Sequence, residues 1–157
     1  MFLFILLIAP LHDVITDPST GKQYIVLNTT TLNHTVNEDI CSNHGGHLPE
    51  PKNPQENMFL NNLGSAMFPL GIRRVEGQWR YDNDGSDVRW MSWASWSHHP
   101  PLPRGDNCVA MVRNFLLADW EGSRNEDWID IPCEFDPVSW LDHRIKSLVC
   151  QKYNKGK

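Results

Sequence analysis

Two aspartates in the C-terminal half of the chain stand shortly before cysteines, and together they could supply some of the ligands of a calcium site. Asp106 lies two residues before Cys108, and Asp130 lies three residues before Cys133. If these two cysteines are bonded to each other, the two carboxylates hold similar places beside the bridge. Calcium is a hard cation that takes about 6–8 oxygen ligands, so two carboxylates supply only part of its shell.

The loop before Cys108 carries two further motifs that could bind a ligand. His98 and His99 are adjacent, and imidazole nitrogen is a common zinc ligand. Because the sequence defines no third ligand for them, we interpret them as solvated loop residues. Residues 104–106 read Arg-Gly-Asp, the tripeptide that integrins recognise in other proteins, but tripeptides recur by chance.

Apolar side chains in the same loop could serve a different kind of ligand. Trp96 stands four residues before Pro100 and Pro101. These side chains either form a contact surface for a protein partner or pack into a small core within the loop itself. The sequence leaves both interpretations open.

The composition and the motifs favour a binding protein. The 157 residues suit one globular domain with a hydrophobic core, and the net charge of -5 argues against nucleic acid or an anionic membrane as the main partner. The chain contains no Gly-x-Ser-x-Gly elbow, no phosphate-binding loop and no His-Glu-x-x-His motif, so we expect no enzyme and no catalytic residues. We interpret the seven tryptophans as large side chains that fill a loop-rich core.

The four cysteines, Cys41, Cys108, Cys133 and Cys150, indicate structural disulfides. They are widely separated and include no Cys-x-x-Cys pair of the kind that binds zinc or does redox chemistry. Four cysteines allow three pairings, and their spacing alone does not choose among them. Disulfides of this kind predict a secreted, extracellular protein.

The N-terminal residues also indicate secretion. Residues 1–11 form an apolar run of signal-peptide length that is too short to span a bilayer. We expect residues 1–17 to be a signal peptide without a clear cleavage site and residues 18–157 to form the mature domain; a hydrophobic N-terminal strand is the alternative. Asn28 and Asn33 each begin a glycosylation sequon, which matters only in the secretory pathway.

A first helix is predicted to begin near residue 33. Either Asn33 or a capping box made by Thr35 and Glu38 could cap it, and the two glycines at 45 and 46 are typical of a helix end. Helical spacing predicts its apolar face, which is Leu32, Val36 and Ile40.

A second helix is predicted from Asn53, a good N-cap that is followed by proline, to about Gly64. Its predicted buried stripe is Met58, Phe59, Leu60 and Leu63. Short apolar runs separated by turn residues predict strands at residues 22–27, 68–72, 78–81, 108–112 and 147–150. Helices early and strands late indicate an α+β domain with a long irregular loop region.

The order of these motifs resembles the C-type lectin-like domain over nearly all of the predicted mature chain. The resemblance rests on Cys41-x-x-x-Gly45-Gly46-His-Leu48-Pro49, Glu56-Asn57-x-Phe59-Leu60, Leu70-Gly71-Ile72, Glu76-Gly77-Gln78-Trp79, Asp84-Gly85-Ser86, Trp93 and Trp128-x-Asp130-x-x-Cys133. It implies two helices, small antiparallel sheets and a long loop region. It also implies the pairings Cys41–Cys150 and Cys108–Cys133, without the additional N-terminal cysteine pair of the family's long form.

The resemblance further implies which residues would bind calcium and sugar. Family lectins hold calcium with a Glu-Pro-Asn or Gln-Pro-Asp triplet, a nearby acidic residue and the Asn-Asp of the Trp motif. Asp106 and Asp130 match two of these positions, but Ile129 replaces the motif's asparagine and His99-Pro100-Pro101 aligns with the triplet. We therefore expect calcium to bind weakly or not at all.

Residues near this site suggest how far it departs from the family pattern. Glu76 and Asn107 are interpreted as remnants of the family's accessory calcium site, although Arg73 and Arg74 stand near where another acid is often found. The segments 108–133 and 133–150 are longer than in compact lectins and carry Trp120 and Trp140.

The sequence thus predicts a secreted C-type lectin-like protein that recognises an extracellular glycan or protein. The predicted ligand-binding residues of the long-loop face are Trp96, His99, Pro100, Pro101, Asp106 and Asn107. One alternative is a calcium-dependent sugar-binding lectin, and a second is an extracellular matrix or structural protein. Sugar specificity and oligomeric state do not follow from the sequence.

Overall fold

The computed structural model describes residues 13–29, 31, 33–63, 67–94, 107–112, 127–134 and 147–154. Several predicted features lie outside these residues: the apolar run at residues 1–11, the long-loop residues Trp96, His98, His99, Pro100, Pro101 and the tripeptide 104–106, and the tryptophans Trp120 and Trp140. Among the described residues, no helix is long and apolar enough to cross a membrane.

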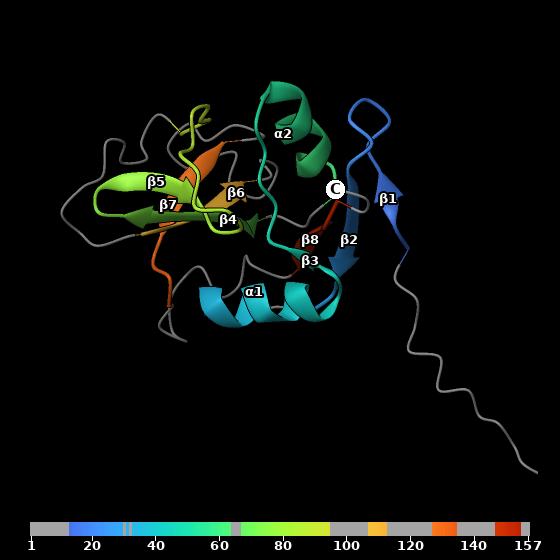
Figure 1. Ribbon diagram of the computed structural model, residues 1–157, viewed down its shortest axis with the longest axis horizontal. Helices are drawn as coiled ribbons and strands as arrows, with labels where there is room; N and C mark the ends of the chain where they lie inside the picture. Colours follow the sequence, from blue (N-terminus) through green and yellow to red (C-terminus); the bar gives the residue numbers. More distant parts are fainter. Residues whose placement is uncertain are drawn as a thin grey trace, which may run out of the picture.

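The described strands form two antiparallel sheets of four strands each (Figure 1). The first sheet has the order β1 (Ile15–Thr16), β2 (Gln23–Leu27), β8 (Leu148–Lys152), β3 (Gly46–His47). The second has the order β5 (Gln78–Tyr81), β4 (Met67–Val75), β6 (Cys108–Val112), β7 (Trp128–Ile131). Figure 1 shows α1 (His34–Asn43) and α2 (Pro54–Asn61) on opposite sides of the strands. The predicted α+β architecture is confirmed.

The first helix starts where the sequence predicts, but it buries a different face. Asn33 is the N-cap, and its side-chain oxygen accepts a hydrogen bond from the Val36 amide. The prediction that Val36 belongs to the buried face is wrong, because Val36 is exposed and the buried residues of α1 are His34, Asn37 and Cys41. The helix therefore presents a largely polar face to the strands beside it.

The second helix follows its capping signals closely. Asn53 accepts a hydrogen bond from the Glu56 amide, with Pro54 in the first turn. Leu60 is buried and Phe59 and Leu63 pack partly against the core, as predicted. Met58 does not belong to this stripe, because it lies on the exposed side of the helix.

The largest core cluster lies between the two sheets and α2, and tryptophan fills much of it. Trp128 is fully buried and its indole N–H donates to Asn57 Oδ1 at 2.7 Å. Trp90 and Trp93 contact the Trp128 ring edge-on, with centroids 5.6 and 5.9 Å away. For the described tryptophans, including the buried Trp79, the prediction of core packing is confirmed.

Both disulfides predicted from the resemblance are present. Cys41–Cys150 joins α1 to β8, and Cys108–Cys133 joins β6 to the segment that follows β7. The β1 strand at residues 15–16 pairs with β2, although these residues fall within the predicted signal peptide. The signal-peptide boundary stays a prediction.

Candidate functional site

The part of the predicted calcium site that the structure describes is the edge formed by β6 and β7. Asp130 lies opposite Val109 and is partly exposed, whereas its neighbour Ile129 is 1% exposed and packs in an apolar cluster with Met67. Ile129 therefore supplies buried methyl groups where the family motif has a side-chain oxygen. Asp106 lies outside the described residues, so its pairing with Asp130 stays a prediction.

The two residues interpreted as remnants of an accessory calcium site, Asn107 and Glu76, have different surroundings. Asn107 Oδ1 accepts a hydrogen bond from Arg74 Nε at 2.8 Å, and the Asn107 carbonyl accepts one from the Arg74 amide at 2.8 Å. Glu76 is exposed in the turn between β4 and β5, with a positive φ of 52°. The side-chain oxygen of Asn107 is therefore already hydrogen-bonded to the guanidinium group of Arg74.

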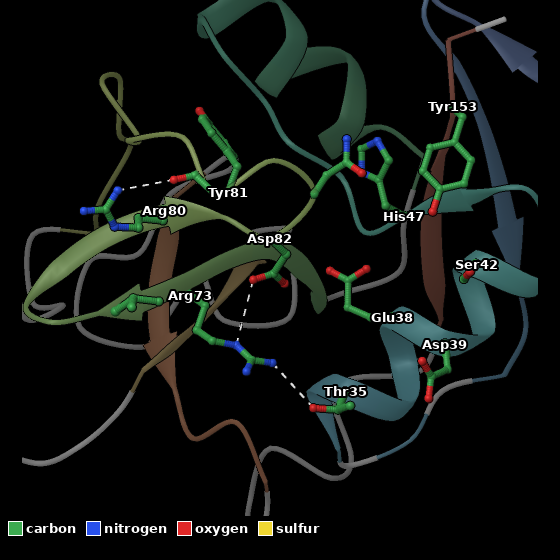
Figure 2. A pocket seen from close by; sticks show the side chains of 13 residues that line it. Thr35, Glu38, Asp39, Ser42, His47, Arg73, Arg80, Tyr81, Asp82 and Tyr153 are labelled. Carbon is green, nitrogen blue, oxygen red and sulfur yellow. Dashed lines mark hydrogen bonds and ion pairs between the residues drawn. The ribbon is translucent and has the colours of Figure 1, made fainter.

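A second polar site lies on another part of the molecule, between α1 and the end of β5. A groove of about 580 Å³ opens here (Figure 2). Glu38 from α1 and Asp82, which directly follows β5, point toward each other across it. The residues that line the groove include Thr35, Glu38, Asp39, His47, Arg73 and Asp82.

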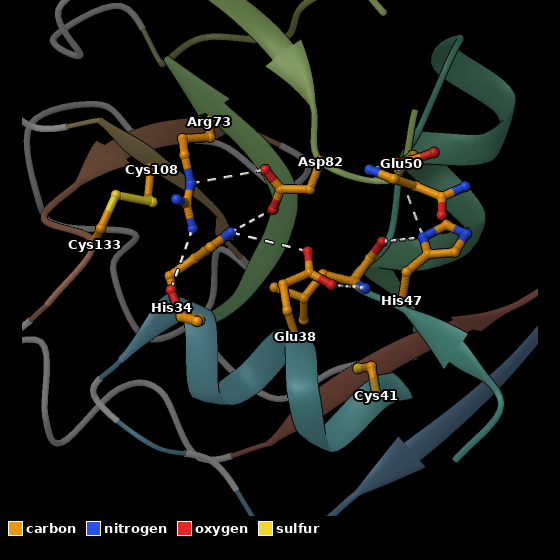
Figure 3. A network of polar contacts seen from close by, with 12 residues as sticks. His34, Glu38, Cys41, His47, Glu50, Arg73, Asp82, Cys108 and Cys133 are labelled. Carbon is orange, nitrogen blue, oxygen red and sulfur yellow. Dashed lines mark hydrogen bonds and ion pairs between the residues drawn. A yellow bond between two sulfur atoms is a disulfide. The ribbon is translucent and has the colours of Figure 1, made fainter. Parts of the chain in front are cut away.

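His34 lies beside these two carboxyl groups and links them (Figure 3). Its Nε2 lies 2.5 Å from Asp82 Oδ2 and 3.9 Å from Glu38 Oε1. The side chains of His34, Glu38 and Asp82 are 3%, 21% and 17% exposed, so the cluster is mostly shielded from water. Arg73 Nε lies 3.8 Å from Asp82 Oδ1 and places a positive charge beside this carboxyl group.

The pKa values of Glu38 and Asp82 are shifted in opposite directions by burial and by their neighbours. Burial and the neighbouring Asp82 raise the pKa of Glu38 to about 9. Burial acts in the same direction on Asp82, but the hydrogen bond to His34 and the nearby charge of Arg73 favour the charged form and help to lower the pKa of Asp82. The two carboxyl groups are therefore shifted in opposite directions, so Asp82 loses its proton at a lower pH than Glu38 does.

This cluster was not predicted from the sequence, in which Glu38 is interpreted as a capping residue and residues 82–86 as a turn. The available signal was the spacing of His34 and Glu38, because residues four apart on a helix share one face. Asp82 carries no such signal, since it reaches the site only through the pairing of β5 with β4.

A further carboxyl group, Glu50, is buried next to the cluster (Figure 3). Its Oε2 accepts a hydrogen bond from the Asn83 amide at 3.2 Å and lies 4.0 Å from His47 Nδ1, while Lys52 Nζ lies 3.9 Å from Oε1. Burial, aided by Asp84 and Asp82, raises the pKa of Glu50 to about 7 against the lowering effect of Lys52.

Glu50→Gln is therefore expected to stabilise the protein more at pH 8 than at pH 5. A carboxyl group whose pKa is raised on folding favours the folded state at low pH, and this contribution is lost as pH rises through about 7. The difference between the two pH values should be about 2.5 kcal/mol, because most of the interval between the ordinary pKa and the raised pKa lies between them and the side chain is only 5% exposed to screening by water. Urea unfolding at both pH values measures it, with the exposed Glu76→Gln as the control. An equal effect of Glu50→Gln at pH 5 and pH 8 would contradict the prediction.

Comparison with known proteins agrees with this fold. Versican core protein from human and from cattle is 26% identical to the chain over 100 residues, which is 62% of this chain and 3% of versican. The chain thus spans only a small part of those relatives.

Two solved structures resemble the chain along most of its length. A calcium-independent type II antifreeze protein superimposes with a TM-score of 0.63 at 19% identity, covering 90% of this chain and 96% of that protein. The carbohydrate-recognition domain of the mouse scavenger receptor C-type lectin superimposes with a TM-score of 0.65 at 18% identity, covering 94% and 98%. At these identities the likeness concerns the fold. The model of the lectin C-type domain matches residues 30–141, and the chain belongs to this family.

Proposed function

We propose that this chain is a secreted, non-enzymatic binding protein that recognises an extracellular glycan or protein through its long-loop face, with weak or no calcium dependence. The observation that carries the proposal is the burial of Ile129 in β7. Calcium takes about 6–8 oxygen ligands, and a buried isoleucine removes one of the oxygens on which the family's sugar site depends.

The geometry beside β7 adds support. The side-chain oxygen of Asn107 is bound to Arg74, so a cation near Asn107 would meet a positive charge. The structurally similar antifreeze protein is calcium-independent, which supports the view that a protein with this fold can act without calcium. The two disulfides support secretion, because such bonds persist in oxidising compartments.

The two sequons differ in how accessible their asparagines are. Asn28 is exposed after β2. Asn33 uses its side-chain oxygen to cap α1 and donates from Nδ2 to Glu134 Oε1 at 2.9 Å. A glycan on Asn33 would be attached through that same nitrogen, so Asn28 is the better candidate for glycosylation.

Calcium-dependent sugar binding is the second candidate, because Asp130 is partly exposed at the edge of β7 and Asp106 is present in the sequence. A glycan array probed with the mature chain in calcium and again in chelator separates the two. We expect any bound ligand to be retained in chelator and to be lost when Trp96 is replaced by alanine.

The matched variants are Asp130→Ala, Asp106→Ala and, as a control, Asp39→Ala, which removes an exposed carboxylate on α1. Sugar binding that disappears in chelator and in Asp106→Ala and Asp130→Ala, but not in Asp39→Ala, would establish the calcium-dependent alternative and end the proposal.

A further inference from the structure

We propose that His34, Glu38 and Asp82 form a zinc-binding site that is separate from the long-loop face. One ring nitrogen and one oxygen from each carboxyl group all lie within 4.8 Å of one another. These are the atom types that bind zinc in proteins, where three protein ligands and one open position are a common arrangement.

A buried atom without a hydrogen-bond partner points to a missing ligand. Glu38 Oε1 is inaccessible to solvent and accepts no hydrogen bond from any described residue. Leaving such an acceptor unsatisfied costs free energy, so the arrangement favours a group that can be inserted beside it. Oε1 faces His34, whose side chain is itself 3% exposed and whose Nε2 lies 3.9 Å away.

The distances need only small adjustments to hold an ion. In a tetrahedral zinc site with bonds of about 2.0–2.1 Å, neighbouring ligand atoms are about 3.3 Å apart. His34 Nε2 now lies 2.5 Å from Asp82 Oδ2 and 3.9 Å from Glu38 Oε1, values on either side of that spacing. Withdrawal of Asp82 and approach of Glu38, each by less than about 1 Å, would create the required geometry.

The helix and a backbone amide hold His34 and Glu38 in place, and the open groove leaves room for a fourth ligand to the ion. His34 and Glu38 are one helical turn apart on α1, and the Leu48 amide donates to the other oxygen of Glu38, Oε2, at 3.2 Å. Glu38 and Asp82 line the open groove of about 580 Å³, from which water or an external ligand can reach the ion. The ring nitrogen favours zinc over calcium, which prefers an all-oxygen shell.

Arg73 is the feature that opposes a cation here, and it makes the proposal sharply testable. Its Nε lies 3.8 Å from Asp82 Oδ1, and its Nη2 donates to Thr35 Oγ1 at 3.5 Å. The side chain is 39% exposed, so it can move into the groove when an ion enters. Replacement of Arg73 by glutamine should therefore tighten metal binding, whereas loss of a ligand should weaken it.

Isothermal titration of the full chain with zinc chloride tests the site. We expect one ion per chain at this site, an affinity at least tenfold lower for Glu38→Gln and for Asp82→Asn, and an affinity several-fold higher for Arg73→Gln. His44→Gln, which changes the exposed histidine that caps the C-terminal end of α1, should leave the affinity unchanged.

A second measurement distinguishes loss of binding from loss of folding. It also distinguishes this site from zinc binding by the loop histidines. Cobalt titration followed by visible absorption should give a band that is lost in Glu38→Gln, while circular dichroism reports whether that variant is folded. The double variant His98→Gln/His99→Gln removes the adjacent loop histidines. The proposal is overturned if the wild-type chain binds no zinc, or if zinc binding survives in folded Glu38→Gln and Asp82→Asn and is lost in the loop double variant.

Discussion

Replacing Cys41 and Cys150 together by alanine is expected to lower the free energy of unfolding by about 4–5 kcal/mol. The bond closes a loop with a sequence separation of 109, and it ties α1 to the central strand β8 of the first sheet. Without it, the unfolded chain gains the conformational freedom that the cross-link removes, and α1 loses its covalent attachment to the sheet. Urea unfolding followed by circular dichroism measures the change.

The second disulfide is the matched comparison for this prediction. Cys108–Cys133 has a sequence separation of 25, so its removal should cost only about 3.5 kcal/mol in the same entropic treatment. A greater loss for Cys108→Ala/Cys133→Ala than for Cys41→Ala/Cys150→Ala would contradict the expected order. It would show that strain or residual structure in the unfolded chain outweighs loop length.

Trp128→Ala is expected to cost about 3–5 kcal/mol, because it removes the largest fully buried side chain of the described core. The substitution would leave a cavity beside Trp90 and Trp93 and remove the hydrogen bond to Asn57. Trp128→Phe keeps an aromatic ring but removes the N–H donor, so its cost should be about 1–3 kcal/mol.

The control is Trp90→Phe, which shortens a ring that is only partly buried and should cost less than Trp128→Phe. Guanidinium unfolding of the variants gives the free energies, and near-ultraviolet circular dichroism reports core packing. If Trp128→Phe destabilises as much as Trp128→Ala, the hydrogen bond to Asn57 contributes most of the stability and cavity formation contributes little.

Local signals predicted the helix starts well, whereas burial depended on what packs against each helix. Asn33 and Asn53 cap their helices through bonds to amides three residues away, so a few residues carry the information. Val36 and Met58 fit an apolar periodicity and yet face solvent. The buried residues of α1 are His34, Asn37 and Cys41, so the helix turns polar side chains inward. Within the helix, the spacing of His34 and Glu38 is a signal of this, but apolar periodicity is not.

Long-range features could be predicted only where a family pattern supplied them. The disulfide pairings followed from the resemblance, because spacing allowed three alternatives. The cluster of His34, Glu38 and Asp82 has no counterpart in that pattern, and 48 residues separate the histidine from the aspartate. Such a site forms only when the strands pair, so no local sequence pattern predicts the groove.

The pairing between the end of β6 and the start of β7 affects how this domain can change during evolution. The amide of Val112, the last residue of β6, donates to the Asp127 carbonyl at 2.8 Å, so the two described residues that flank positions 113–126 are held together by a backbone hydrogen bond. Doubling the length of a loop between fixed ends costs only about 0.6 kcal/mol in closure entropy. The Cys108–Cys133 bond clamps the same two strands from their other end. Insertions and deletions between these anchors can therefore accumulate at little thermodynamic expense, and the scaffold can acquire new surfaces there while its core stays unchanged.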